Sequence, residues 1–308
     1  MKLSDHQRLR GLVAATHTPI HADGALNLAV VEKQCAYLLA NSVTSVFIGG
    51  TTGESSSLSL DERRSLALRW TEVARGTPMR VVVHVGANAL ADARVLAADA
   101  EQLGAHAIAA LAPSYFKPRS LDALIACATE IAAAAPATPF YFYDIPSMTG
   151  VSFPMGDFLA QARERIPTLG GIKFTNPDLM SLQLCLHADG GAWDVPFGCD
   201  EFLLAALALG ATGAVGSTYN FAAPIYTRLI AAFQRGDLAA ARAEQFRSVR
   251  LVQLLSGIGF MGAAKAVMGM LGVAVGPARL PNGTPTPEQI VSLRSSLETM
   301  GFFDWIKN

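Results

Sequence analysis

The sequence has little cysteine and no close cysteine pairs. Its 308 residues include four cysteines, Cys35, Cys127, Cys185 and Cys199, which lie far apart along the chain. Disulfide-rich secreted scaffolds need a high density of cysteine, and structural zinc sites need cysteines paired at short spacing. The pattern fits neither class, and we expect reduced, mostly buried thiols in a cytoplasmic protein.

Three further features are missing. The chain has no run of basic residues and a formal net charge of −1, so it lacks the positive patch typical of nucleic-acid-binding proteins. No apolar stretch reaches the roughly 18 uninterrupted residues that indicate a transmembrane helix. Residues 1–6 contain no apolar segment typical of a signal peptide. We expect a soluble, intracellular protein with no nucleic-acid partner and no membrane partner.

The composition, with 51% hydrophobic and 16% charged residues, suits a protein with one large core. Short apolar runs rich in β-formers alternate with longer segments of helical pattern. The expected strands are residues 11–16, 43–48, 80–85, 105–111, 139–143, 169–173, 193–197 and 213–216. Helices are expected at 26–41, from 59 onward, and at 90–104, 121–135, 154–163, 178–188, 201–209 and 223–235.

Eight strand–helix units predict a parallel sheet, and eight is the number that closes into a (β/α)8 TIM barrel. The expected strands are apolar throughout, as strands covered on both faces are. A doubly wound open sheet is the alternative, but no Gly-x-Gly-x-x-Gly motif follows the first strand. We assign residues 1–235 to a barrel that carries the active site. Residues 236–308 are expected to form a C-terminal extension of three helices, at 237–256, 262–271 and 286–300, packed on the barrel.

One lysine interrupts the apolar pattern of the sixth strand. Lys173 follows Gly171 and Ile172 at a position where a buried strand normally carries aliphatic side chains. Burying an ammonium group is costly, so a lysine there is either paired or neutral. A neutral amine is a nucleophile for carbonyl carbon. Because most lysines at strand ends reach solvent, the strand alone leaves a structural role open.

Active sites of barrels form at the C-terminal ends of the strands. The second strand ends in a loop, residues 49–54, whose glycines and threonines suit either a neutral cradle for a carboxylate or a tight capped turn. The fifth strand ends with Tyr143, next to the strand of Lys173. Neighbouring strands lie about 4.8 Å apart, so a phenol and an amine there could serve one substrate atom.

The seventh and eighth strands also end in polar residues. Asp200 and Glu201 stand at a helix start, where capping is the commoner role and binding of a polyhydroxylated substrate is the functional one. Residues 216–220 carry small hydroxyl side chains. His17 and His84, at the ends of strands one and three, are too few for a metal site and are assigned to packing or hydrogen bonding. A site built on lysine and tyrosine points to Schiff-base chemistry without metal or cofactor.

Three segments together resemble the superfamily of N-acetylneuraminate lyase and dihydrodipicolinate synthase, which are class I Schiff-base aldolases. They are residues 50–54 (GTTGE), 143–146 (YDIP) and 171–175 (GIKFT), and the resemblance extends over essentially the whole chain. It implies that Lys173 forms the imine with pyruvate and that Tyr143 relays the proton. It also implies that Thr51 and Thr52 bind the pyruvate carboxylate.

Within this superfamily the chain looks most like the lyases. The likeness implies that substrate is bound by Thr175, Gly198, Asp200, Glu201 and Ser217. Met148 occupies the place where the synthases usually carry an arginine for a second carboxylate. The implied reaction is reversible cleavage of N-acetylneuraminate to N-acetyl-D-mannosamine and pyruvate. The alternatives are a 2-keto-3-deoxy sugar acid aldolase, dihydrodipicolinate synthase, and a barrel that binds pyruvate or sugar without catalysis.

Two positions depart from the family pattern or extend it. Asp144 stands where Asn or His is more usual, and its carboxylate could change the pKa of Tyr143. Tyr115 lies in a segment whose aromatic residues, in relatives, can reach the site of a neighbouring subunit. The resemblance implies a homotetramer.

Overall fold

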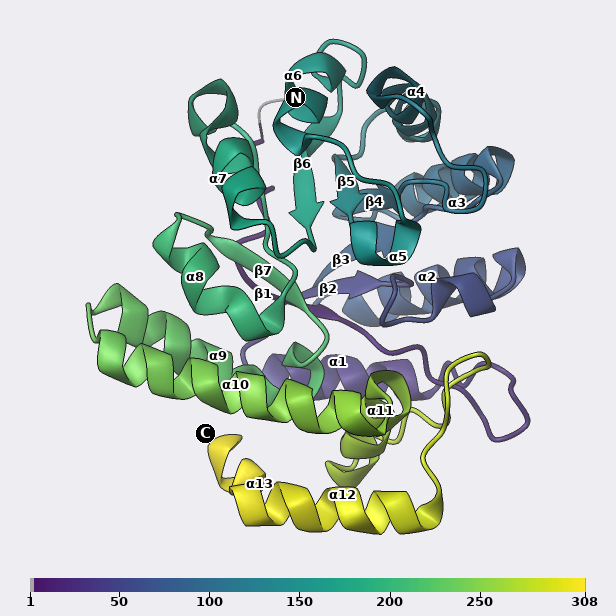
Figure 1. The fold of residues 1–308 in the computed structure, drawn as a ribbon. Helices are drawn as coiled ribbons and strands as arrows, with labels where there is room; N and C mark the ends of the chain where they lie inside the picture. The colour runs from purple at the N-terminus through teal and green to yellow at the C-terminus, as the bar shows by residue number, and fades with distance from the viewer. Residues whose placement is uncertain (1–2, 308) are drawn as a thin grey trace.

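A computed structural model describes residues 3–307, and within them seven parallel strands form one sheet that curls on itself (Figure 1). Met1, Lys2 and Asn308, at the ends of the two assigned parts, lie outside the described residues. The sheet order is β6-β5-β4-β3-β2-β1-β7. The strands are β1 Gly11–Ala15, β2 Ser45–Ile48, β3 Arg80–His84, β4 Ala107–Leu111, β5 Phe140–Asp144, β6 Leu169–Phe174 and β7 Gly213–Gly216.

The expected strand at 193–197 is not a regular strand. It is an extended segment that makes isolated parallel bridges to β6 on one side and to β7 on the other. The Ile172 N–H donates to the Asp194 carbonyl at 3.0 Å, and the Phe197 N–H donates to the Gly213 carbonyl at 2.9 Å. These contacts close the barrel, so the predicted fold class is confirmed with seven strands and one bridging segment.

The local sequence explains why this segment is irregular. Pro196 has no N–H to donate, so a continuous ladder is impossible there. On the neighbouring strand, a Cβ at Gly171 would lie 1.7 Å from the Asp194 carbonyl oxygen, so only glycine permits this approach. This close approach brings the bridging segment against β6 two residues before Lys173.

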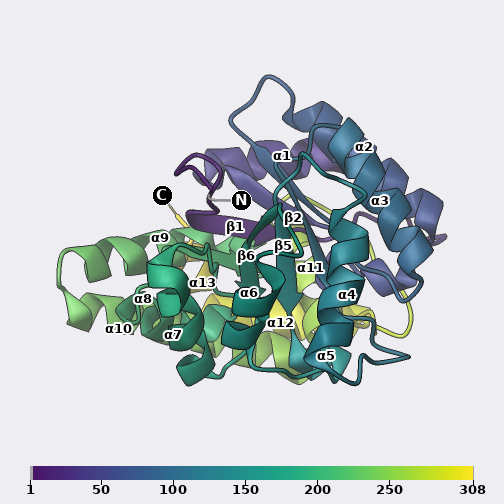
Figure 2. The same ribbon diagram turned by 90° about the horizontal axis from the view of Figure 1, so that it is seen from above.

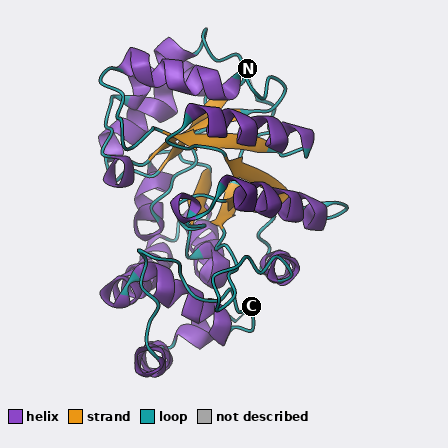
Figure 3. Ribbon diagram, turned by 90° about the vertical axis from the view of Figure 1, so that its right-hand side faces the viewer, coloured by secondary structure: helices purple, strands orange, loops and turns teal. Residues whose placement is uncertain are grey.

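Helices surround the strands, as Figures 2 and 3 show from two further directions. They are α1 Val30–Ala40, α2 Leu60–Ala74, α3 Leu90–Gln102, α4 Leu121–Ala132, α5 Pro146–Thr149, α6 Met155–Ala162, α7 Leu179–His187, α8 Leu203–Ala208 and α9 Tyr219–Gln234. The capping box predicted at the start of α2 is present, because Ser59 and Glu62 bond reciprocally. The first helix begins four residues later than expected, because Leu26 instead forms an antiparallel bridge with Ile20.

The N-terminal end of the barrel is sealed by the chain's own first residues. Leu3 and Leu9 are buried in the same apolar cluster as the inward side chains of the strands. The Leu9 N–H and the Tyr141 hydroxyl both donate to Asp194 Oδ2, each at 2.7 Å. With that end filled, the opposite, C-terminal end of the strands is the mouth of the barrel.

Among residues 236–307, four helices follow the barrel where three were expected, because the short α13 follows the turn at Gly301. They are α10 Leu238–Ile258, α11 Phe260–Met270, α12 Pro287–Met300 and α13 Phe302–Trp305. α10 packs along α9, and α11 lies beside the barrel mouth in Figure 1. Within residues 3–307 no single helix is long and apolar enough to cross a membrane, and only α10 with α11, bent by 113° at their break, meets that condition by length and composition.

Candidate active site

Lys173 and Tyr143 face each other at the mouth of the barrel. They are direct register partners on β6 and β5, as the order of the strands predicts. Lys173 Nζ lies 3.6 Å from the centroid of the Tyr143 ring and 3.9 Å from that of Phe47. The lysine is 3% exposed and the tyrosine 2% exposed. The amine therefore lies between two aromatic faces inside the barrel.

The protonation states of both groups follow from this burial. Burial lowers the pKa of Lys173 well below its usual value, and the negative charge of Asp200 opposes that effect only in part. Burial raises the pKa of Tyr143 to about 12, against the opposing hydroxyls of Thr51 and Thr175. The site thus favours a neutral, nucleophilic amine beside a protonated phenol.

The loop after β2 and the end of β7 bring hydroxyls to the same place. Thr51 Oγ1 and the Tyr143 hydroxyl are 3.2 Å apart, within hydrogen-bond distance. Thr52 Oγ1 and Ser217 Oγ are 2.6 Å apart. Thr52, which is assigned to the substrate carboxylate, therefore lies beside Ser217, which is assigned to the substrate. Thr51, the other threonine of the pair, contacts the phenol of Tyr143.

Asp200 is held by hydrogen bonds within the protein. Its Oδ2 accepts from the N–H and the hydroxyl of Thr218, at 2.9 and 2.6 Å. A Cβ at Gly216 would lie 1.9 Å from Oδ1, so glycine leaves room for the carboxylate. Asp200 does not cap the following helix, the alternative to substrate binding, because its carboxylate bonds to Thr218 in the turn before α9. Glu201 is only partly buried, which leaves its carboxylate more accessible.

A chain of buried hydroxyl contacts continues from Asp200 into α10. The Thr218 hydroxyl lies 2.6 Å from the Tyr226 hydroxyl, which lies 2.8 Å from Ser248 Oγ. Ser248 Oγ lies 3.2 Å from the Asp200 carbonyl oxygen. Because these side chains are buried and in contact with one another, they hold Asp200 in a fixed position.

Gly198 and Thr175 are packed against each other across the closure of the barrel. The Gly198 N–H donates to the Phe174 carbonyl at 2.7 Å. A Cβ at Gly198 would lie 1.9 Å from Thr175 Oγ1 and 2.9 Å from Thr175 Cα. The structure therefore places both predicted residues beside the Lys173 strand, with a glycine required for their approach.

Comparison with known proteins decides the family. The sequence model of the dihydrodipicolinate synthetase family matches residues 8–300. The chain belongs to this family. It is 41% identical to N-acetylneuraminate lyase of Mus musculus over 300 residues, which cover 96% of this chain and 94% of that protein. It is 40% identical to N-acetylneuraminate lyase of Gallus gallus over 302 residues, covering 97% and 98% of the two chains.

Solved structures agree with the sequence relatives. The structure of Proteus mirabilis N-acetylneuraminate lyase superposes with a TM-score of 0.93 at 39% identity, over 96% of this chain and 99% of that one. The barrel and the C-terminal helices of this family member therefore follow a known family architecture over nearly their full length.

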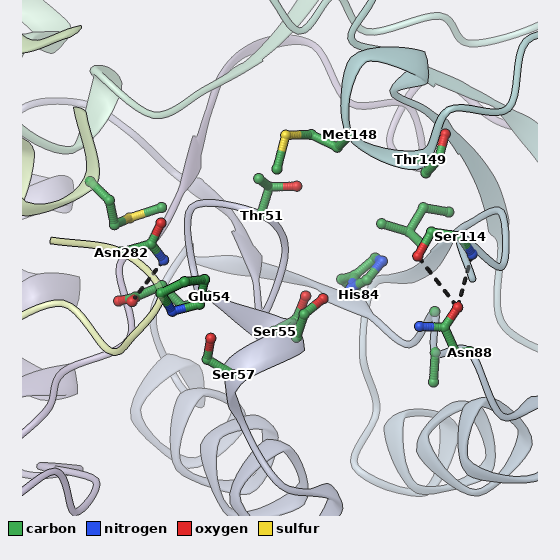
Figure 4. Close-up of a pocket in the computed structure, with 16 residues that line it drawn as sticks. Thr51, Glu54, Ser55, Ser57, His84, Asn88, Ser114, Met148, Thr149 and Asn282 are labelled. Carbon is green, nitrogen blue, oxygen red and sulfur yellow. Dashed lines mark hydrogen bonds between the residues drawn. The ribbon is translucent and has the colours of Figure 1, made fainter. Parts of the chain in front are cut away.

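A cavity of about 250 Å³ opens beside Thr51 at the barrel mouth (Figure 4). Its lining includes His84, Asn88, Ser114 and Met148, together with Asn282 from the C-terminal part of the chain. Lys173 and Tyr143 do not line it, because they lie deeper, and Thr51 connects the cavity to the phenol. In the part of the chain that the structure describes, no group of three His, Cys, Asp or Glu side chains is placed to hold a metal ion.

Both histidines assigned to packing or hydrogen bonding are buried. His84 Nδ1 lies 2.9 Å from the Gly49 carbonyl, and its ring packs edge-on against Tyr143 at 5.8 Å. Burial lowers the pKa of His17 to about 3, with a further effect from the positive charge of Lys265. Burial also lowers the pKa of His84, so both rings favour the neutral form, and His84 supports the loop after β2 through Gly49.

Asp144 lies on the other face of β5 from Tyr143, because successive side chains of a strand alternate. Its Oδ2 accepts from Asn176 Nδ2 at 3.0 Å, and burial raises its pKa to about 6. The groups that shift the pKa of Tyr143 do not include Asp144. Its main-chain carbonyl accepts from the Thr175 N–H at 2.8 Å, so Asp144 joins the two strands of the site behind the reacting groups.

Sequence reasoning missed Phe47 and Glu54 as parts of this site. Phe47 is the second aromatic wall of the amine, and inward alternation along β2 is the signal that could have identified it. Glu54 belongs to the quoted GTTGE segment, but its partners come from residues 265–282, more than two hundred positions away. No local pattern predicts that contact.

The packing of Gly198 makes a direct prediction. Gly198→Ala should lower kcat about tenfold and lower stability by about 1–3 kcal/mol, because the new methyl group must displace Thr175 or the loop. The matched control is Gly156→Ala in α6, where a Cβ meets nothing closer than 3.8 Å. Steady-state kinetics measures kcat, and urea unfolding measures the stability of the two variants. Equal behaviour of the two variants would mean that Thr175 is not held by this contact.

Proposed function

We propose that this family member is an N-acetylneuraminate lyase, which reversibly cleaves N-acetylneuraminate to N-acetyl-D-mannosamine and pyruvate. The observation that carries the proposal is the buried Lys173 amine in register with the Tyr143 phenol. The choice of substrate is supported by relatives of about 40% identity that carry this name over nearly their whole length.

In the first half of the reaction the neutral Lys173 amine attacks the ketone carbon of the open-chain substrate. The phenol of Tyr143 donates a proton to the resulting hydroxyl, which leaves as water, and an iminium and a phenolate remain. The phenolate then takes the proton of the C4 hydroxyl while the electron pair of the C3–C4 bond moves into the iminium. The products of this step are the sugar aldehyde and an enamine.

In the second half Tyr143 returns its proton to C3 of the enamine, and water hydrolyses the renewed iminium. Pyruvate leaves, the amine is restored, and the phenolate recovers the proton that hydrolysis releases. A phenol whose pKa is raised to about 12 gives a strongly basic phenolate, which suits removal of a proton from an alcohol. No step requires a cofactor.

The substrate contacts are part of the same proposal. Thr51 and Thr52 hold the carboxylate, and the 3.2 Å contact of Thr51 with the phenol supports this placement. Ser217 adjoins Thr52, so it contacts substrate near the carboxylate as well as the chain beyond it. Thr175, Gly198, Asp200 and Glu201 line the other side. Because Asp200 is bonded to Thr218, Glu201 supplies the freer carboxylate for sugar hydroxyls.

Glu201 should control the choice of sugar. Glu201→Ala is expected to lower kcat/KM for N-acetylneuraminate by roughly 10- to 100-fold, because hydrogen bonds to a charged group are lost. Trapping of pyruvate on Lys173 should stay unchanged. Glu164→Ala, at an exposed position of the chain, is the control. An unaltered ranking of sugar acids in the Glu201 variant would show that another residue recognises the sugar.

A substrate panel tests the proposed activity. Pyruvate release from N-acetylneuraminate and from 2-keto-3-deoxy sugar acids is compared with condensation of pyruvate and aspartate semialdehyde. Met148 is 62% exposed at the cavity and offers no charge for a second carboxylate, so the synthase reaction is expected to be undetectable. Higher kcat/KM on a keto-deoxy acid would reassign the enzyme, and no turnover with any substrate would favour a non-catalytic barrel.

Assembly, domain division and location complete the proposal. Tyr115 and Phe116 are 79% and 86% exposed and pack edge to face, which supports contact with another copy in a homotetramer. Analytical ultracentrifugation measures the oligomeric state in solution.

The proposed domain division is a barrel, residues 1–235, and a C-terminal extension, residues 236–308. The four free cysteines support a reducing, cytoplasmic location.

A further inference from the structure

Glu54 has an unusual conformation two residues after Thr52, at the end of residues 49–54, which we call the carboxylate loop. Its φ and ψ are 56° and 36°, in the left-handed region that residues other than glycine rarely adopt. Its side chain is 1% exposed. Such a conformation persists only where surrounding contacts hold it, and such residues cluster at functional sites. The contacts of Glu54 therefore indicate what the loop is built for.

Each of those side-chain contacts comes from the C-terminal extension. Glu54 Oε1 lies 2.6 Å from Lys265 Nζ on α11, and the lysine side chain is also 1% exposed. Glu54 Oε2 accepts from the Arg279 N–H at 2.8 Å and from Asn282 Nδ2 at 3.3 Å, a bond visible in Figure 4. Lys265 in turn donates to the Pro277 carbonyl at 2.7 Å. One carboxylate thus joins α11 and the 277–282 segment to the barrel mouth.

The loop is fixed again on its far side by Arg279. This guanidinium donates to the Ser57 carbonyl at 2.8 Å and to Glu62 Oε2 at 2.8 Å. Within the loop, the Glu54 N–H donates to the Thr51 carbonyl at 3.0 Å. A movement of Glu54 is therefore passed directly to Thr51, the residue that contacts Tyr143.

Lys265 is the cationic partner of Glu54 in this arrangement. His17 lies in the same buried region, but burial lowers its pKa to about 3, so its imidazole favours the neutral form. A buried ion pair is a weak source of stability, because desolvation offsets the attraction and an apolar pair of the same size often does as well. An ion pair also fixes the distance and orientation of its two side chains, here Glu54 and Lys265. That defined geometry fits a loop whose hydroxyls must meet a carboxylate at fixed positions.

We propose that the buried pair Glu54–Lys265 is the positioning device of the carboxylate loop, through which the C-terminal extension sets Thr51 and Thr52 for the carboxylate of the substrate. This inference rests on the proposed function, because it takes the carboxylate site from it. It assigns the extension a part in substrate binding. Glu54 and Lys265 are positioning residues and do not touch the reacting atoms.

The test measures trapping of a ketone on Lys173 by borohydride as a function of ketone concentration. Glu54→Gln keeps the shape of the side chain and removes its charge. The half-saturating pyruvate concentration is expected to rise roughly 10- to 100-fold, the size expected when hydrogen bonds to a charged ligand are misaligned. Acetone, which lacks a carboxylate, should label the variant and the unaltered protein at the same rate. A general loss of structure would instead reduce the labelling of Lys173 by both ketones.

The matched control is Glu244→Gln, which breaks another ion pair of the extension. Glu244 lies 2.9 Å from Arg228 and 2.6 Å from Arg247, and its side chain is 11% exposed. This variant should lose stability in urea but keep the pyruvate half-saturation. If Glu54→Gln does not fold, Asn282→Ala removes one outer contact of the same carboxylate and should raise the half-saturation a few-fold. Lys265→Arg should preserve it better than Lys265→Met.

The outcomes separate this inference from the proposed function. Trapping of pyruvate in the unaltered protein with an unchanged half-saturation in the Glu54 and Asn282 variants would overturn the positioning role alone. Equal weakening of pyruvate and acetone would also overturn it, since the effect would not concern the carboxylate. No trapping of pyruvate in the unaltered protein would instead overturn the proposed function.

Discussion

Replacing Lys173 by methionine is expected to lower kcat for N-acetylneuraminate cleavage by about four orders of magnitude or more. The variant keeps the length of the side chain but has no nucleophile to form the imine, and loss of a covalent nucleophile has effects of this size. Pyruvate release in a coupled assay measures it. Lys33→Met, at an exposed position of α1, is the matched control and should keep full activity.

The same substitution should make the protein more stable near neutral pH. Burial lowers the pKa of Lys173 in the folded chain, while the unfolded chain keeps a value near 10.5. Between the two pKa values the unfolded state binds more protons than the folded state, so the native lysine costs stability, and this cost shrinks as pH rises toward 10.5. Lys173→Met removes the cost. Its advantage in urea unfolding should therefore be larger at neutral pH than near pH 10.5.

These two results together exclude a trivial explanation. A variant that is inactive and more stable has lost chemistry and not its fold, which is the trade-off expected of a strained functional group. Residual activity within a factor of about ten of the unaltered enzyme would mean that another group forms the imine. A stability difference that does not depend on pH would mean that Lys173 is charged in the folded protein.

Replacing Tyr143 by phenylalanine is expected to lower kcat by roughly 10²- to 10⁴-fold, the range typical of general acid–base groups. The ring that packs against Lys173 remains, and only the proton relay is lost. Pyruvate should still form an adduct with Lys173 at long incubation times, although more slowly. Thr51→Val removes the hydroxyl 3.2 Å from the phenol and should have a smaller effect in the same direction.

Tyr141 provides a matched control two residues earlier on β5. It is buried like Tyr143, but its hydroxyl donates to Asp194 near the sealed end of the barrel. Tyr141→Phe should cost about 1–3 kcal/mol of stability, because a buried acceptor loses its partner, and should leave kcat nearly unchanged. Similar losses of kcat in the two variants would indicate that strand packing, and not a proton relay, explains the effect at Tyr143.

The features that sequence could predict are those set by local pattern and strand order. The apolar runs placed seven strands, and the adjacency of consecutive strands in a barrel brought Tyr143 and Lys173 to one height. The apolar residues of the segment at 193–197 predict a strand, although Pro196 is a local signal against a regular central strand. Its bridges to β6 and β7 could not be predicted, because they depend on the close approach of Gly171 to Asp194.

The contacts that sequence could not predict join distant parts of the chain. Asp200 has the local signature of a helix cap, but its partner is Thr218, eighteen residues later on another βα loop. Glu54 meets Lys265 only because α11 returns to the barrel mouth. Both depend on tertiary packing, and both concern residues that hold the site in place instead of reacting. Local pattern therefore predicted the reacting residues, whereas the residues that hold them in place could be identified only from the folded structure.

Borohydride reduction of the protein in the presence of pyruvate, followed by peptide mass mapping, tests the central claim most directly. A neutral, buried Lys173 that forms an iminium predicts one reduced pyruvyl adduct, located on the peptide that contains Lys173 and absent without pyruvate. An unmodified Lys173, or an adduct spread over exposed lysines such as Lys33 and Lys117, would contradict the account.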